Sequence, residues 1–233
     1  MLDIRNVDTA YGSVPMLRGL ELAVRPGELV CLLGPNGAGK TTTFMTICGI
    51  VRARRGAVHV MGNDIAKIGT ENLAGLGVGV VPEGRRLFPG LSVLENIRLG
   101  YDAVSNHGDQ FDKQLDRMCE LFPRIRERLK QAAGTLSGGE QAMVALARAL
   151  VGNPKFVVMD EPSLGLSPKL ISEYFGITAE IHRRGTTILL IEQNAEMGLK
   201  IADRAYVLVK GKVAQEGPAK DLAASRVTAG LYL

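Results

Sequence analysis

The sequence predicts an α/β fold with a mixed sheet, an N-terminal antiparallel β part and a mostly helical subdomain insert. Short runs rich in Val, Ile and Leu alternate with helical patterns along most of the chain. One apolar run ends at a glycine-rich turn that leads directly into a helical pattern, a connection typical of α/β domains. The stretch 91–150 has almost no β-branched runs and is expected to form several helices. We therefore expect a single domain over 1–233, with a core of 1–90 and 151–233 and a helical subdomain at 91–150.

Strands are expected where short apolar runs lie between turn residues. Alternating runs indicate half-exposed strands, and unbroken apolar runs indicate buried ones. The expected strands are residues 2–7, 20–24, 28–33, 57–61, 78–81, 156–160, 186–191, 205–209 and 213–216. A helix is expected over 40–50, turns at 62–64 and 210–212, and breaks in the helical insert near 106–109 and at Pro123.

The composition is that of a globular protein without a strongly charged binding face. Hydrophobic residues make up 46% of the chain and charged residues 22%, and 28 basic against 24 acidic residues leave a net charge of +4. This charge is too small to indicate nucleic acid as a partner. Three scattered cysteines, Cys31, Cys48 and Cys119, indicate a reduced cytosolic protein. No apolar run approaches the ~20 residues of a membrane span, so we expect membrane contact only through a protein partner.

Residues 34–41 form a candidate phosphate-binding loop. They fit the pattern G-x-x-x-x-G-K-[ST] and lie between an expected strand and an expected helix, which is the context that the pattern requires. Glycines let backbone N–H groups turn toward phosphate oxygens, and the helix N-terminus adds a partial positive charge. Lys40 can reach the β- and γ-phosphates, and the Thr41 hydroxyl can ligate Mg²⁺. The expected nucleotide-binding residues are Gly34, Pro35, Asn36, Gly37, Ala38, Gly39, Lys40, Thr41 and Thr42.

Two adjacent acids, Asp160 and Glu161, end the apolar strand expected at 156–160. Adjacent strand residues point to opposite faces, so the two carboxylates can take different roles. We assign Asp160 to Mg²⁺ and Glu161 to the general base that activates water. The alternative is a pair of solvated acids that closes a strand, and the phosphate-binding loop upstream argues against it.

Residues 136–141, with the sequence LSGGEQ, begin another expected helix. Ser137 is a good N-cap and Glu140 follows three residues later, so this segment alone predicts a well-capped helix. LSGGEQ ahead of an apolar strand that ends in Asp-Glu resembles the signature of ATP-binding-cassette ATPases. The resemblance covers essentially the whole chain. We refer to 136–141 below as the signature segment.

The resemblance implies a role for each matching position. Tyr11 looks like the aromatic residue that stacks on adenine. The alternative is a tyrosine that only ends a strand. Family members pair head to tail, so the signature segment of one chain closes over the ATP of the other. The residues that would then contact the partner's nucleotide are Ser137, Gly138, Gly139 and Glu140. ATP would close the dimer and hydrolysis would reopen it.

Two positions depart from the common family pattern. Glu83 follows the strand at 78–81, where the family usually has a glutamine near Mg²⁺, and an ionised carboxylate cannot donate a hydrogen bond. Gln193 stands where the family usually has a histidine, and an amide does not titrate near neutral pH. The expected metal contacts are therefore Thr41, Glu83 and Asp160, and the expected catalytic residues are Lys40, Glu161 and Gln193.

Several short segments look like one branch of the family. VPEGRR, LFPGLSV, DEPSLGLSP and IEQN are similar to the smaller ATPase of Liv-type importers of branched-chain amino acids. This likeness implies a second ATPase chain, two membrane permease subunits, a periplasmic binding protein and a place at the cytoplasmic face of the inner membrane. In isolation the chain would pair with itself. Closely similar ATPases serve urea uptake, and a soluble ATP-driven switch is the alternative from another class.

The segment after Glu83 is a candidate docking surface for the membrane subunits. It comprises Arg85, Arg86 and the run 88–91, which starts with Phe88. The alternative is an ordinary loop that anchors Phe88 and Leu91 in the core.

Overall fold

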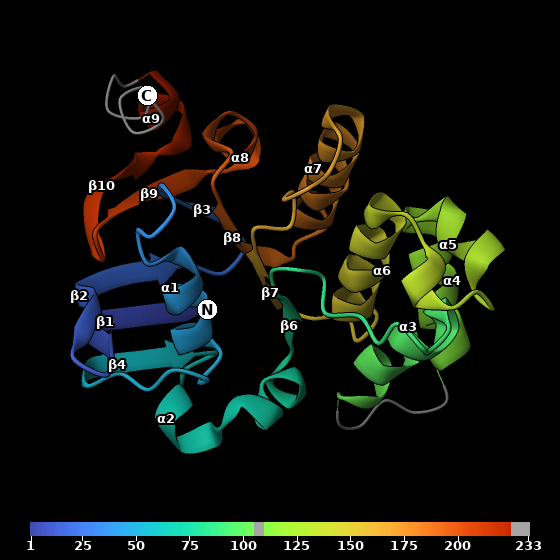
Figure 1. Ribbon diagram of the computed structural model, residues 1–233, viewed down its shortest axis with the longest axis horizontal. Coiled ribbons are helices and arrows are strands. Elements are labelled where there is room, and N and C mark those ends of the chain that lie inside the picture. Colours follow the sequence, from blue (N-terminus) through green and yellow to red (C-terminus); the bar gives the residue numbers. More distant parts are fainter. Residues whose placement is uncertain (105–109, 225–233) are drawn as a thin grey trace.

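The chain builds two sheets and a group of helices, as the computed structural model of residues 1–104 and 110–224 shows (Figure 1). The larger sheet has the strand order β10-β9-β3-β8-β7-β6. Its strands are β3 (Leu29–Leu33), β6 (Val78–Val81), β7 (Phe156–Asp160), β8 (Thr187–Glu192), β9 (Arg204–Val209) and β10 (Lys212–Pro218). All neighbours are parallel except β10, which pairs antiparallel with β9. The carboxyl ends of the parallel strands therefore meet at one edge of the sheet.

The smaller sheet is antiparallel and has the order β2-β1-β4-β5. Its strands are β1 (Leu2–Tyr11), β2 (Val14–Val24), β4 (Arg55–Val60) and β5 (Asn63–Asp64). The predicted turn at 62–64 is wrong in detail. Met61 and Gly62 make the turn with positive φ angles, while Asn63 and Asp64 pair with β4 as a short edge strand.

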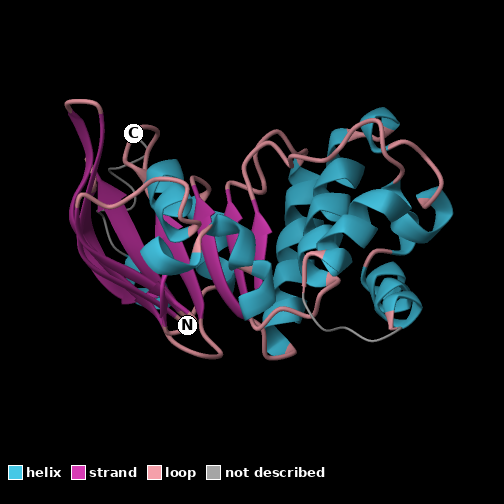
Figure 2. Ribbon diagram, turned by 90° about the horizontal axis from the view of Figure 1, so that it is seen from below, coloured by secondary structure: helices cyan, strands magenta, loops and turns pink. Residues whose placement is uncertain are grey.

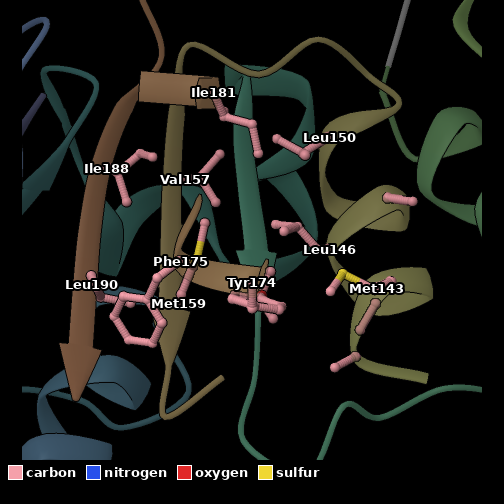
Figure 3. Close-up of a cluster of buried hydrophobic side chains, with 14 of the residues drawn as sticks. Met143, Leu146, Leu150, Val157, Met159, Tyr174, Phe175, Ile181, Ile188 and Leu190 are labelled. Atoms are coloured by element: carbon pink, nitrogen blue, oxygen red, sulfur yellow. The ribbon is translucent and has the colours of Figure 1, made fainter. Parts of the chain in front are cut away.

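Both faces of the larger sheet are covered. Every residue of its strands β3, β7 and β8 is therefore buried. On one face, α6 (Gly138–Leu150) and α7 (Pro168–Arg183) pack against β7 and β8 through the side chains in Figure 3. On the other face, α1 (Lys40–Ile47) and the antiparallel sheet share a second apolar cluster. Figure 2 shows the strands gathered at one end of the molecule.

The described residues of 91–150 form helices, which lie beyond the sheet on the side away from β1 and β2 (Figure 1). They are α3 (Val93–Asp102), α4 (Phe111–Leu121), α5 (Pro123–Arg128), a 3₁₀ turn at Ala133–Thr135, and α6. The predicted break at Pro123 is confirmed, since this proline is the first residue of α5. The break expected near 106–109 lies outside the described residues. The subdomain boundaries themselves stay a prediction.

The remaining elements are short connections and a final helix. They are α2 (Ile65–Ile68), 3₁₀ turns at Thr70–Asn72 and Ala74–Leu76, α8 (Ala195–Ile201) and α9 (Ala219–Ala224). The predicted hairpin at 210–212 is confirmed: Lys210 and Gly211 have φ angles of 47° and 79°, which suit a tight two-residue turn. The helix expected over 40–50 ends earlier, at Ile47. No described helix is long and apolar enough to cross a membrane.

Arg204 at the start of β9 ties four segments together. Its guanidinium group binds both carboxylate oxygens of Glu28, at 2.7 and 2.9 Å, and donates to the Ala23 carbonyl at 2.7 Å. It also pairs with Glu216 of β10 at 2.6 Å. The side chains of Arg204 and Glu28 are only 15% and 13% exposed. The pair is thus largely desolvated, and removal of one partner would leave a buried charge without its counterion.

We expect Arg204→Ala to lower the free energy of unfolding by about 3 kcal/mol, because Glu28 would lose its bidentate partner. Lys200→Ala is the control, since it breaks an ion pair with Glu196 whose side chains are 62% and 79% exposed. The control should cost less than about 0.5 kcal/mol. Urea denaturation of both variants measures the difference, and equal stabilities would contradict this role of Arg204.

Candidate nucleotide site

The phosphate-binding loop connects β3 to α1, and close contacts with neighbouring backbone fix its course. A β-carbon on Gly34 would lie 2.6 Å from the Leu208 carbonyl oxygen of β9. Gly39 has a φ of 109°, and a β-carbon there would lie 2.9 Å from the Leu17 side chain. The Ala38 carbonyl accepts a hydrogen bond from Gly211 at 2.8 Å. Only glycine fits at positions 34 and 39, and the loop is held against the β9–β10 hairpin.

Lys40, the first residue of α1, is buried beneath this loop with 4% exposure. Its ammonium group donates to the carbonyls of Gly34 and Pro35 at 2.8 and 3.2 Å. The same group forms an ion pair with Glu161 Oε1 at 3.0 Å. The ammonium group therefore points into the loop, where it can exchange these acceptors for phosphate oxygens.

Asp160, the last residue of β7, is fully buried. Neither carboxylate oxygen makes a hydrogen bond of ordinary geometry with a described residue. Burial, followed by the nearby carboxylates of Glu161 and Glu83, raises the pKa of Asp160 from 3.8 to about 7, although the Thr41 hydroxyl and Lys40 oppose the rise. A buried carboxylate without a counterion is costly as an anion, so it favours either a bound proton or a bound cation.

These residues fit Mg²⁺ that arrives with a nucleotide. The described chain has no cluster of three His, Cys, Asp or Glu side chains that could hold a metal by itself. Mg²⁺ needs no such cluster, because it is commonly bound by one or two protein oxygens together with phosphate oxygens and water. Asp160 and the Thr41 hydroxyl beside it supply such oxygens.

Glu161 directs its carboxylate into the same space. Its backbone has a φ of 44°, an unusual value for a residue with a side chain, and its N–H donates to the Ile191 carbonyl at 2.9 Å. The side chain is 11% exposed and pairs with Lys40. The backbone conformation thus holds the Glu161 carboxylate at the phosphate-binding loop.

A cavity of about 380 Å³ lies in front of the loop. The structure brings Glu83, Glu161 and Gln193 into this cavity together with loop residues, as the sequence predicted. Met16 and Leu164 also line it, and neither was among the predicted site residues. The complete lining is Met16, Asn36, Gly37, Gly39, Lys40, Thr41, Thr42, Glu83, Glu161, Leu164 and Gln193.

Several predicted contacts do not line this cavity, among them Tyr11, Gly34, Pro35, Ala38 and Asp160. Tyr11 is 48% exposed, and its hydroxyl donates to Met45 Sδ of α1 at 3.5 Å. Its contact with adenine stays a prediction. None of the signature residues 137–140 lines the cavity either. Within one chain the signature segment is therefore separate from the phosphate-binding loop.

The signature segment is a capping box at the start of α6. The Ser137 hydroxyl and the Glu140 carboxylate are 2.7 Å apart, and the Ser137 N–H donates to that carboxylate at 2.9 Å. The hydrogen bond from Ser137 lowers the pKa of Glu140, and Arg128 pairs with Glu140 at 2.6 Å. The N-terminus of α6 is thus rigid, with the N–H groups of Gly138 and Gly139 in its first turn.

The candidate docking segment is also rigid, but its parts face different ways. Asn96 is fully buried and binds both the N–H and the carbonyl of Phe88, at 2.9 and 3.0 Å. The Phe88 ring is nevertheless 54% exposed, so the alternative that Phe88 anchors the loop in the core is wrong. Phe88 and two other exposed apolar residues, Ile50 and Leu99, line a groove of about 460 Å³. Arg85 lies elsewhere, against the start of α6.

Glu192 is a buried acid beside the candidate site that the sequence reasoning did not single out. It ends β8 as Asp160 ends β7, and the same signal of an acid after an apolar run marks it. Its carboxylate accepts hydrogen bonds from the N–H groups of Ser163, Gln193 and Asn194, at 3.1, 3.1 and 3.3 Å. Burial raises the pKa of Glu192, and these hydrogen bonds oppose the rise. Glu192 thus joins the loop after Glu161 to the loop that carries Gln193.

A strand, a glycine-rich phosphate loop, a helix and acids at the ends of neighbouring strands define a P-loop ATPase fold. The sequence profile described as ABC transporter matches residues 17–164. The chain belongs to this family, and it is the ATPase component of an ABC transporter. The resemblance stated from the sequence and the predicted fold class are both confirmed.

Named relatives fall into more than one transport system. The high-affinity branched-chain amino acid transport ATP-binding protein BraG of Pseudomonas aeruginosa is 44% identical over 213 residues, 91% of each chain. A probable LivF of Archaeoglobus fulgidus is 33% identical over 95% of this chain and 94% of its own. The lipopolysaccharide export protein LptB of Haemophilus influenzae is 34% identical over 100% of this chain and 97% of its own.

A solved structure agrees with this assignment. The ADP conformation of MJ1267, an ATP-binding cassette of an ABC transporter, superposes with a TM-score of 0.86. The two chains are 26% identical, and the match covers 100% of this chain and 98% of the other.

We expect Asp160→Asn to stabilise the protein in metal-free buffer that contains a chelator. A carboxyl whose pKa is raised by folding takes up a proton when the chain folds, so the wild type loses stability as pH rises from 3.8 through about 7. Each pH unit in this window corresponds to about 1.4 kcal/mol, so the variant should be more stable at pH 8 by about 2 kcal/mol or more.

The measurement is urea denaturation at pH 5 and at pH 8. The advantage of the variant should shrink toward pH 5, where the wild-type carboxyl is largely protonated. An unchanged difference between the two pH values would contradict the assignment of the buried charge.

Proposed function

We propose that the chain is the ATP-hydrolysing motor subunit of a membrane importer for branched-chain amino acids. The similarity to BraG carries this proposal, because the sequence identity to BraG is 44% and the identity to LptB is 34%. The motifs VPEGRR and IEQN point to the same branch. The chain would lie at the cytoplasmic face of the inner membrane as a peripheral subunit. No nucleic acid enters the cycle.

ATP would bind in the cavity in front of the phosphate-binding loop. Backbone N–H groups of the loop and the Lys40 ammonium group bind phosphate oxygens, and Tyr11 stacks on the adenine. The Thr41 hydroxyl and the Asp160 carboxylate hold Mg²⁺, with Glu83 near it through water. Bound Mg²⁺ neutralises phosphate charge and so supports phosphoryl transfer.

Glu161 would act as the general base. Its carboxylate lies 3.0 Å from Lys40 Nζ, so a phosphate that binds Lys40 competes directly with Glu161 for the ammonium group. This exchange frees the Glu161 carboxylate to accept a proton from the attacking water. Gln193, which lines the same cavity, donates a hydrogen bond to the terminal phosphate.

The active unit would be a head-to-tail pair of ATPase chains. The Ser137 hydroxyl and the first N–H groups of α6 form an anion site that does not reach the chain's own nucleotide cavity. A second chain can bring its nucleotide to this site. In the transporter this second chain is a homologous ATPase, and in isolation it is another copy. ATP closes the pair and hydrolysis reopens it.

One of the two integral membrane permease subunits would dock in the groove that Phe88, Ile50 and Leu99 line, and the other would dock on the second ATPase chain. These exposed apolar side chains share one groove of about 460 Å³, which suits an apolar helix from a partner. A periplasmic binding protein would deliver the amino acid to the permease subunits. Substrate choice lies in those partners, so a related urea importer and a soluble switch remain outcomes of the test below.

We expect a strain that lacks this gene to lose uptake of labelled leucine, and wild type to restore it. Glu161→Gln should fail to restore uptake, because an amide cannot accept the proton from water. The purified variant should still bind labelled ATP, since Lys40 and the loop are intact. If the wild type restores only the uptake of urea, the chain belongs to a urea importer. If the uptake of neither leucine nor urea depends on this gene, the importer proposal is refuted.

We expect Phe88→Ser to reduce leucine uptake about tenfold, because a buried aromatic anchor at an interface commonly contributes about 1–2 kcal/mol. ATP hydrolysis by the purified chain should stay within about twofold of wild type, since the ring is solvent-exposed in the single chain. Leu99→Ser, on the same groove, should act in the same direction. Equal losses of hydrolysis and uptake would contradict docking at this groove.

A further inference from the structure

Arg85 directs its guanidinium group to the start of α6. A β-carbon on Gly138 of the signature segment would lie 3.1 Å from each terminal nitrogen of Arg85. A β-carbon on Gly165, in the loop after Glu161, would lie 3.8 Å from Nη2. Nη1 also donates a long hydrogen bond of 3.4 Å to Gln141 Oε1. The guanidinium group thus lies between the signature segment and the 162–167 loop.

Arg85 meets a partial positive charge at this position, although the Glu140 carboxylate of the capping box lies at the same helix end. The N-terminus of a helix carries a partial positive charge, which repels a guanidinium group. Arg85 makes no ion pair within 4.0 Å to any residue in 1–104 or 110–224. Glu83 and Glu161 line the same cavity of about 210 Å³ as Arg85 but do not pair with it.

The backbone is held in an uncommon conformation that presents this side chain. Three successive residues, Gly84, Arg85 and Arg86, have φ angles of 74°, 66° and 45°. Arg148 of α6 fixes them by donating to the carbonyls of Arg86 and Arg85 at 2.7 and 3.0 Å. Because Arg148 already holds the loop to α6, the weak contact between Arg85 and Gln141 is not needed for that purpose.

We propose that Arg85 binds the terminal phosphate of the ATP held by the facing chain. This inference rests on the head-to-tail closure proposed above. The Ser137 hydroxyl, the N–H groups of Gly138 and Gly139 and the Arg85 guanidinium group would then form one anion site. A guanidinium group presents a planar fork of donors that matches phosphate oxygens, and negative charge spreads over these oxygens during phosphoryl transfer.

The chain's own nucleotide is a poorer match for Arg85. The cavity in front of the phosphate-binding loop is lined by Glu83 from the same segment, whereas Arg85 lines the neighbouring cavity together with Ala142 and Ala145 of α6. Arg86 provides a natural comparison. Its Nε donates to the Glu83 carbonyl at 3.2 Å, so its side chain points back to its own loop.

The test uses the full chain that carries Glu161→Gln, which binds ATP without hydrolysing it. Size-exclusion chromatography at rising ATP concentrations measures the concentration that gives half-maximal dimer. Arg85→Ala added to this chain should raise that concentration about tenfold, because it removes charge-assisted hydrogen bonds to phosphate. Arg85→Lys should give a smaller increase. Arg86→Ala, which removes the same charge from the next position, should leave the concentration unchanged.

Binding of labelled ADP to the monomer is the second measurement, and it should be the same in all variants. A dimer that forms at the same ATP concentration with Arg85→Ala as without it would overturn the inference while head-to-tail closure stands. Weaker ADP binding in proportion to the loss of dimer would also overturn it, because Arg85 would then act within its own chain. If the Glu161→Gln chain forms no dimer with ATP, closure between copies fails and the inference fails with it.

Discussion

The close contact between the phosphate-binding loop and strand β9 is the constraint on which the site depends. Gly34 lies where a β-carbon would be 2.6 Å from the Leu208 carbonyl oxygen, so only glycine lets the loop lie this close to the strand. Strand β3, which carries the loop, pairs with β8 on one side and β9 on the other. Strand β7 lies next to β8 and runs parallel to it. The acids at the carboxyl ends of β7 and β8 therefore lie at the same edge of the sheet as the loop.

This convergence concentrates buried negative charge, and each carboxylate is neutralised in a different way. Glu192 accepts three backbone N–H groups. Glu161 pairs with Lys40 at 3.0 Å. Asp160 has neither, and burial with the two neighbouring acids raises its pKa to about 7. Asp160 is therefore the carboxylate of this group that a cation beside Thr41 would stabilise most.

Sequence patterns predicted most of this arrangement because the signals are local. A glycine-rich loop between a strand and a helix, and a capping box at Ser137, are each determined within a few residues. Asn63 and Asp64 were assigned to a turn because Asn and Asp favour turns, whereas Met61 and Gly62 make the turn and let Asn63 and Asp64 pair with β4 in a local hairpin. The direction of Arg85 depends on left-handed backbone angles that Arg148, 63 residues away in the chain, holds in place. Such long-range constraints leave no local signal.

The contacts of α6 connect the signature segment to the Phe88 groove. Arg148 holds the carbonyls of Arg85 and Arg86, and a β-carbon on Gly100 of α3 would lie 2.0 Å from the Arg148 carbonyl. Asn96, also on α3, holds the backbone of Phe88. A shift of α6 must therefore carry α3 and Phe88 with it, or break these part-buried or exposed hydrogen bonds at about 0.5–1.5 kcal/mol each. The packing favours movement as one unit.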